Sequence, residues 1–302
     1  MNLLENVQQA GTAAPPGVFK AYYELTKPRL SLLSVFTGIV GYLTAVTAID
    51  WLLLSAVAIG TALAAASAAV LNEWMERDID ARMTRTRVRP LPSAHVGERT
   101  VLVYGLLLGT GGCLFLQATV NGLAAFLALA TLVIYLLIYT PLKTKSPWCT
   151  EVGAIAGALP PLIGWAAAEG TISTGGWVLF GILFTWQMPH FMAIAWRFRE
   201  DYRQAGLPML SVVDPSGDRS ALRSLVYTLL LIILSLVWWV IGASTLMYGI
   251  AATGLGIYLL NEALRFAKES ERDVAARGLF RASILYLPLL MGILVVDRFL
   301  FS

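Results

Sequence analysis

The sequence is poor in charged residues and in cysteine, and each shortage excludes a class of protein. Only 14% of the 302 residues are charged, whereas 57% are hydrophobic, which is unusual for a soluble domain. The two cysteines, Cys113 and Cys149, stand alone, so we expect packing residues and not a cysteine metal site. The net charge of +3 is small and comes from residues flanking apolar runs, so we expect no nucleic-acid partner.

What the chain has instead is long apolar runs, with a mean hydropathy of +0.70. A helix needs roughly 20 mostly apolar residues to cross a bilayer. The alternation typical of membrane strands is absent. The sequence therefore predicts an all-α integral membrane protein with nine transmembrane helices, near 30–48, 51–71, 100–118, 122–140, 151–168, 177–196, 221–241, 244–262 and 279–298.

Lysine and arginine lie almost entirely on one side of these nine helices. Of the 22 such residues, 21 fall in the N-terminal segment or in the loops after the second, fourth, sixth and eighth helices, and only Arg298 lies opposite. Basic loops mark the cytoplasmic face, so we expect the N-terminus to be cytoplasmic and the C-terminus outside. Residues 1–29 are expected to be a lead-in and interfacial segment without a cleaved signal peptide, and 30–302 a single transmembrane domain.

A row of oxygen-bearing side chains follows the second predicted helix. Asn72, Glu76 and Asp80 are spaced by four residues, and each step drifts only about 40° around a helix, so the three share one face. An arginine-rich segment, 82–89, comes next. Carboxylates beside guanidinium groups suit Mg²⁺ that holds a phosphorylated group. We therefore expect Asn72, Glu76 and Asp80 to be catalytic metal ligands.

Two long loops, 73–99 and 197–220, lie on the predicted cytoplasmic side, and both carry acids among basic residues. The second begins with Arg197, Glu200 and Asp201. Long loops between membrane helices are often functional. Two such loops could hold a diphosphate between them, and the apolar bundle could hold a hydrocarbon tail. A ligand with both parts is an isoprenyl diphosphate. Its ionisation leaves an allylic carbocation, which dry walls protect from water.

These features resemble the UbiA superfamily of intramembrane prenyltransferases. The superfamily signature Asn-x-x-x-Asp-x-x-x-Asp is filled by Asn72, Glu76 and Asp80, with glutamate replacing the middle aspartate. The similarity covers most of the first seven predicted helices, and the region 221–302 adds only helices. The segments most similar to the branch that acts on haem B are 24–29, 77–80, 85–92, 157–165, 186–191 and 200–210.

The resemblance implies a UbiA-type bundle, Mg²⁺ as cofactor, and transfer of a farnesyl group from farnesyl diphosphate to a vinyl group of haem B. The products are haem O and diphosphate. It also implies the bacterial cytoplasmic (inner) membrane, an active site on the cytoplasmic side, and haem A synthase or a terminal oxidase as candidate partners.

The remaining site residues are predicted from the family resemblance together with their positions in the chain. Diphosphate contacts are expected from Arg85, Arg89, Lys143 and Arg197, whereas Lys27 and Arg29 are expected to be membrane anchors. Asp201 is expected to be catalytic and, with Glu200, to hold a second metal.

One histidine, His190, lies in the sixth predicted helix after Pro189. An ionisable side chain inside a membrane helix is a functional candidate. Imidazole can ligate haem iron or pair with a propionate, so we expect His190 at the haem site in one of these two roles.

Two other functions fit parts of the pattern. A prenyltransferase acting on a quinone or chlorophyll precursor would use the same diphosphate site. A transporter or haem carrier would also have many helices, but its polar site usually lies near the membrane midplane. Here the polar residues gather at one face.

Overall fold

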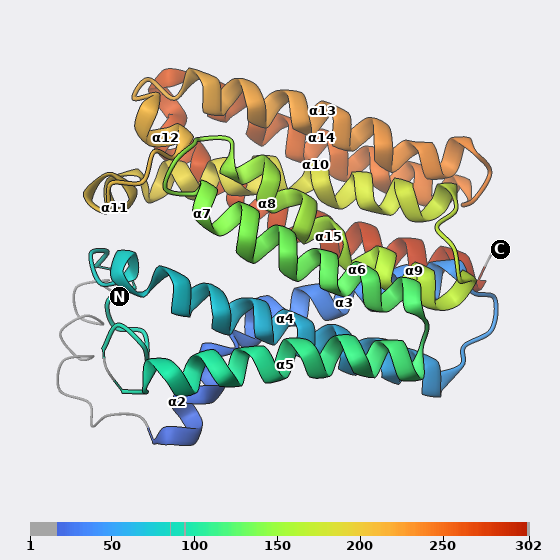
Figure 1. Ribbon diagram of the computed structural model, residues 1–302. Coiled ribbons are helices and arrows are strands. Elements are labelled where there is room, and N and C mark those ends of the chain that lie inside the picture. The colour runs from blue at the N-terminus through green and yellow to red at the C-terminus, as the bar shows by residue number, and fades with distance from the viewer. Residues whose placement is uncertain (1–16, 85, 94, 301–302) are drawn as a thin grey trace.

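The computed structural model describes residues 17–84, 86–93 and 95–300, and every regular element in these ranges is a helix (Figure 1). The elements in chain order are α2 (Val18–Leu25), α3 (Pro28–Ala45), α4 (Trp51–Asp80), α5 (Glu98–Thr119), α6 (Gly122–Val133), the π-helix η1 (Ile134–Tyr139), α7 (Thr140–Leu142), α8 (Cys149–Ala158), α9 (Pro160–Glu169), α10 (Thr174–Arg197), α11 (Arg199–Gln204), α12 (Leu210–Val213), α13 (Asp218–Val240), α14 (Leu246–Ala267), the 3₁₀ turn η2 (Glu269–Glu271) and α15 (Arg272–Leu300).

Seven helical segments in the described part of the chain are long and apolar enough to cross a membrane. They are α4, α5, α6 to α7, α8 to α9, α10, α13 and η2 to α15. The predicted spans 30–48 and 244–262 correspond to α3 and α14, which run alongside the others (Figure 1) but do not reach the same apolarity. Pro28 and Arg29 begin α3, and Glu262 and Arg265 lie in α14. The all-α membrane architecture is confirmed, while the count of nine spans stays a prediction.

Prolines interrupt two of the spans. Pro160 and Pro161 have no N–H to donate, and the helix is broken between α8 and α9. Pro141 likewise cannot donate to the carbonyl group four residues before it, and the preceding turns widen into the π-helix η1. Thr140 Oγ1 donates 2.8 Å to the carbonyl oxygen of Tyr135 within that helix. Single π-helical turns are frequent at functional sites.

Two glycines allow α3 and α9 to lie in direct backbone contact. A Cβ atom on Gly41 would overlap the carbonyl oxygen of Pro161, and a Cβ atom on Gly164 would overlap that of Gly38. Small residues let membrane helices approach closely. The contact matters for the site because both helices line the cavity described below, which adjoins the candidate site.

The structure corrects the predicted loop 73–99, because α4 continues through Asp80. With 30 residues, α4 is about 45 Å long and exceeds a hydrocarbon layer of about 30 Å. Its last turns can therefore stand at the membrane surface with Asn72, Glu76 and Asp80 on an ordered helix. The second predicted loop, 197–220, is also partly helical, because α11 and α12 lie in it and α13 begins inside it.

Candidate active site

The C-terminal turns of α4 carry a row of four buried polar side chains, which we call the α4 row: Asn72, Glu73, Glu76 and Asp80. None is more than 4% exposed. Isolated carboxylates this buried would be costly, so they need cations or hydrogen-bond donors. Residues from three other segments supply these partners.

Each carboxylate of the α4 row faces one cation. Lys143 Nζ, just after α7, donates to both oxygens of Glu76 at 2.9 and 3.1 Å. Arg89, in the loop after α4, forms an ion pair with Asp80. Lys27, between α2 and α3, has its Nζ 4.0 Å from Glu73 Oε2.

Asn72, the first member of the row, is held by a neutral partner. Its Nδ2 donates to Thr140 Oγ1 at 3.1 Å, and Thr140 in turn bonds the Tyr135 carbonyl group in η1. Thr140, the first residue after the π-helix, thus presents its hydroxyl group to the α4 row. Within the π-helix, Tyr135 stacks on Tyr139, with ring centroids 5.1 Å apart.

A cavity of about 360 Å³ adjoins this charged cluster. The polar groups that line it include Lys27, Lys143, Tyr135, Tyr139 and Gln187. Its wall on α4 is made of small side chains from the turns before the row: Thr61, Ala64, Ala65, Ala68 and Ala69. The same helix therefore carries acids at its end and a smooth apolar wall beneath them, which suits an amphiphile with an anionic head.

Two lysines, Lys27 and Lys143, bring positive charge to the cavity lining. Lys27 adopts a left-handed backbone conformation with φ of 44°, and only 18% of its side chain is exposed. Burial, followed by the nearby Arg89, lowers the pKa of Lys27 to about 8, although the carboxylates of the row oppose the shift. Burial also acts to lower the pKa of Lys143, but facing Glu76 outweighs it and the net shift is upward.

Two buried oxygens of the row have no hydrogen-bond partner, Oε1 of Glu73 and Oδ1 of Asp80. Hard cations such as Mg²⁺ prefer carboxylate oxygens, so these orphaned atoms fit a divalent cation. In the described part of the chain, no three His, Cys, Asp or Glu side chains already converge on one point. Binding of a cation would therefore need the carboxylates of the row to turn away from their lysine and arginine partners.

The predicted site residues fall into two groups. Arg89 and Lys143 join Asn72, Glu76 and Asp80 at the row, whereas Arg85 lies outside the described residues. A second group lies on α10 and α11: Arg197, Glu200 and Asp201. Glu200 is exposed and pairs with Arg203, Asp201 is half-buried, and Arg197 packs over two phenylalanines. The contacts of Glu200 and Arg197 are not with the row.

Sequence reasoning missed Glu73 and the role of Lys27. Glu73 precedes Glu76 by three residues, and Glu76 precedes Asp80 by four, so the three share one helix face. This spacing can be read from the sequence, but Glu73 is not part of the family signature. Lys27 was expected to be an anchor because a basic residue before a membrane helix usually is one. Its burial depends on how α2 and α3 pack.

His190 lies between two aromatic rings on the α10 side of the cavity. Its ring stacks on Trp186 at a centroid distance of 5.0 Å and on Phe280 of α15 at 5.1 Å. Nδ1 is 2.9 Å from Ser283 Oγ. Trp186 and the neighbouring Phe191 line the cavity, so the histidine stands at its margin.

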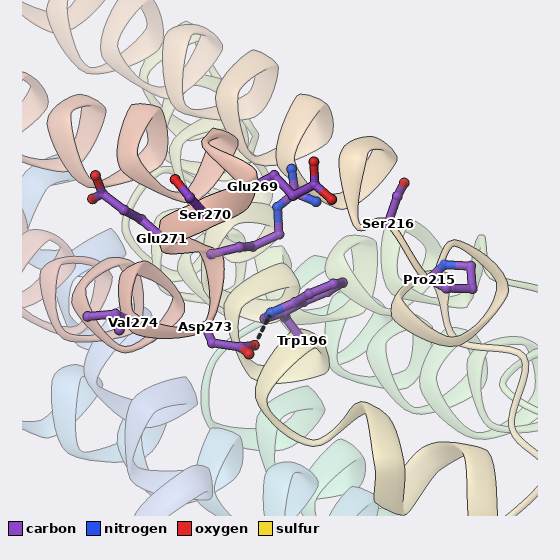
Figure 2. A pocket seen from close by; sticks show the side chains of 9 residues that line it. Trp196, Pro215, Ser216, Glu269, Ser270, Glu271, Asp273 and Val274 are labelled. Carbon is purple, nitrogen blue, oxygen red and sulfur yellow. Dashed lines mark hydrogen bonds between the residues drawn. The ribbon is translucent and has the colours of Figure 1, made fainter.

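A second pocket, of about 210 Å³, lies where α10 ends against the start of α15, and Figure 2 shows it. Trp196 Nε1 donates to Asp273 Oδ1 at 2.7 Å, the bond drawn in Figure 2. Arg199 also pairs with Asp273 at 3.0 Å and covers the Trp196 ring at 4.4 Å. These contacts attach the end of α10 to α15 and so fix where Arg197 stands.

Comparison with known proteins agrees with this geometry. Residues 33–285 match the UbiA prenyltransferase family. The chain belongs to this family. It is 50% identical over 287 residues to protohaem IX farnesyltransferase of Opitutus terrae, covering 95% of this chain and 97% of the relative. The corresponding protein of Solibacter usitatus is 44% identical over 287 residues, with 92% and 98% covered.

Solved UbiA-family structures share the fold. A digeranylgeranylglyceryl phosphate synthase superposes with a TM-score of 0.80 at 18% identity, covering 93% of this chain and 98% of that one. A UbiA homologue of Archaeoglobus fulgidus, bound to GPP and Mg²⁺, has a TM-score of 0.65 at 15% identity, covering 91% and 99%. At these identities the likeness concerns the fold alone.

Proposed function

We propose that this UbiA-family chain transfers a farnesyl group from farnesyl diphosphate to a vinyl group of protohaem (haem B), giving haem O and diphosphate. The observation that carries the proposal is a cluster of partly buried lysine and arginine side chains beside an apolar cavity. The acceptor is supported by the identity, over nearly the whole chain, to two proteins named protohaem IX farnesyltransferase.

In this proposal Lys27, Arg89 and Lys143 bind the diphosphate. When the bond between C1 and oxygen breaks, its electron pair stays on the diphosphate, where the three cations stabilise the charge. The vinyl π electrons form the new carbon–carbon bond. Water then adds to the cation left on the porphyrin side chain and loses a proton, which leaves a hydroxyl group. Apolar walls keep water from reaching the farnesyl cation earlier.

The α4 row would hold Mg²⁺ through Asn72, Glu76 and Asp80, with Glu73 beside them. Asp201 and Glu200 are the proposed ligands from α11. When bound, Mg²⁺ neutralises charge on the leaving diphosphate. The lysines and arginine that now face the row would be released to the phosphate oxygens, so the ion pairs act as a resting arrangement of the same site.

The proposed topology has nine transmembrane helices, with α3 and α14 added to the seven most apolar segments. The N-terminus and the α4 row lie on the cytoplasmic side of a bacterial inner membrane and the C-terminus lies outside, following the distribution of lysine and arginine. Haem O made there would pass to haem A synthase or to a terminal oxidase.

A labelling experiment separates this function from its rivals. Purified protein receives labelled farnesyl diphosphate, Mg²⁺ and an equimolar mixture of haem B and an aromatic quinone precursor. Label in the haem fraction supports the proposal, whereas label in the aromatic fraction shows a quinone-type enzyme. Uptake of haem into proteoliposomes with no covalent product in either fraction would indicate a carrier.

A pH dependence follows from Lys27. Because its pKa is about 8, Lys27 is charged below pH 8 and neutral above it, so affinity for the diphosphate is expected to fall as pH rises through that value. KM for farnesyl diphosphate should rise several-fold between pH 7 and pH 9. The variant Lys27→Arg, which stays charged, should lose this rise, and an unchanged profile in that variant would contradict the assignment.

A further inference from the structure

At the margin of the cavity, α10 and α15 form an aromatic surface that ends in a positive charge, which we call the α10–α15 wall. Trp186 lines the cavity, whereas His190, Phe280 and Arg197 lie beside its lining. His190 and Arg197 are seven residues apart on α10, two helical turns or about 10 Å, and so share a face. Trp186, His190 and Phe280 stack in sequence along this face. The Arg197 guanidinium carbon lies 5.4 Å from the Phe280 ring centroid. An apolar surface thus leads continuously to a guanidinium group.

The proton positions on His190 follow from its neighbour. Ser283 has a single hydroxyl proton, and its Oγ donates it to the carbonyl oxygen of Phe280 at 2.7 Å. At 2.9 Å from Nδ1 of His190, the same oxygen must therefore accept, so Nδ1 carries the proton. A neutral imidazole has only one N–H. Nε2 is then left with a lone pair.

Nε2 of His190 is open to a ligand. Both faces of the ring are covered by Trp186 and Phe280, so only its edge is available. In the described residues, Nε2 has no hydrogen-bond partner and is not among the buried orphaned atoms. A histidine that ligates a metal commonly donates its other N–H to an oxygen, which fixes its orientation. His190 has that arrangement.

Arg197 differs from the cations at the α4 row. Lys27, Arg89 and Lys143 each face a carboxylate of the row, whereas Arg197 is exposed and no carboxylate of the described residues lies within ion-pair distance of it. Its contacts are the rings of Phe198 and Phe280. A guanidinium group binds carboxylates through paired hydrogen bonds.

Building on the proposed function, we infer that the α10–α15 wall is the acceptor site, with His190 Nε2 as axial ligand to the protohaem iron and Arg197 as partner of a propionate. The sequence had suggested the diphosphate as the ligand of Arg197. Protohaem is a flat apolar macrocycle with two carboxylates at one edge and its vinyl groups toward the opposite side. Holding the propionates at Arg197 directs the vinyl side into the apolar cavity.

The test measures binding separately from turnover. The wild-type protein in detergent is titrated with ferric mesohaem, which has ethyl groups in place of vinyl groups and cannot react. Binding is followed by absorption and electron paramagnetic resonance spectra. His190→Ala is expected to lose the spectrum of histidine-ligated haem and to regain it with free imidazole. Ser283→Ala, which keeps the ring but removes its anchor, should weaken the ligation without abolishing it.

Arg197→Gln should keep the histidine-ligated spectrum but bind mesohaem at least about tenfold more weakly. This is the effect expected from losing one hydrogen bond between charged groups. That loss should vanish with mesohaem dimethyl ester, whose carboxylates are blocked. The matched control is Arg219→Gln, an exposed arginine at the start of α13, which should bind as the wild type does.

An unchanged spectrum in His190→Ala would overturn the iron contact. Weaker binding of farnesyl diphosphate in Arg197→Gln, with mesohaem affinity retained, would overturn the propionate contact and restore the diphosphate role. If the wild-type protein binds no mesohaem, haem B is not the acceptor and the proposed function itself is wrong. That result is distinguishable from the two variant results above, which overturn only the contacts of His190 and Arg197.

Discussion

Replacement of Asp80 by alanine is expected to lower the rate of prenyl transfer by at least about 100-fold. A loss of this size is typical when an enzyme loses one group that stabilises charge developing in the transition state. Asp80 is 1% exposed, pairs with Arg89, and has a second oxygen without a partner. The substitution removes the proposed metal ligand and leaves Arg89 without its carboxylate. Initial rates in detergent measure the loss, and the melting temperature shows that the protein is folded, since alanine favours helix.

The neighbouring Asp78 provides a matched control for Asp80. It lies on the same turn of α4, but its side chain is 79% exposed and, among the described residues, its ion pair is with Arg77 at 3.9 Å. Asp78→Ala changes the net charge equally and should retain close to full activity. If Asp80→Ala were as active as Asp78→Ala, the α4 row would not be the catalytic centre.

Substitution of Gly164 by alanine is expected to be among the most destabilising single changes in the chain. The added Cβ would overlap the carbonyl oxygen of Gly38 and lie 2.7 Å from the amide nitrogen of Tyr42. Both are backbone atoms, so α3 and α9 must separate. Overpacking of this kind costs about 3 kcal/mol or more when no side chain can move aside. Thermal unfolding in detergent measures it, and activity should fall too, because both helices line the cavity.

Gly111→Ala is the control for this change. Gly111 lies in α5, and a Cβ there would meet no atom within 4 Å. The variant should melt at or slightly above the wild-type temperature, because alanine favours helix over glycine. Equal melting temperatures for Gly164→Ala and Gly111→Ala would contradict the close contact of α3 with α9.

Hydropathy located the helices but set several boundaries short of the helix ends: α15 begins at Arg272 and not near 279, and α14 ends at Ala267 and not near 262. The largest difference is at the end of α4. The predicted span 51–71 begins at Trp51, as α4 does, but α4 ends at Asp80. The last turns of α4 are polar, so the apolar span ended at 71, whereas the four-residue spacing of Asn72, Glu76 and Asp80 predicted a helix that continues to Asp80, as found. These turns stay helical because tertiary partners such as Lys143 and Arg89 bury their polar face. The break at Pro160 inside the span 151–168 was also not predicted.

Only part of the candidate site could be predicted from the sequence. The shared face of Asn72, Glu76 and Asp80 follows from helical spacing alone, because all three lie on one helix. The contact between Lys27 and Glu73 joins segments distant in the chain and arises from packing. The same holds for Arg197, whose place beside Phe280 depends on how α10 meets α15. Local periodicity carries no information on such contacts.

Mass spectrometry of haems extracted after incubation tests the central claim most directly. Purified protein is incubated with haem B, farnesyl diphosphate and Mg²⁺, with and without a chelator. The expected result is a haem carrying a hydroxyethylfarnesyl group that forms only when the metal is available. Unmodified haem B from protein shown to be folded, with farnesyl diphosphate also unconsumed, would contradict the proposed function.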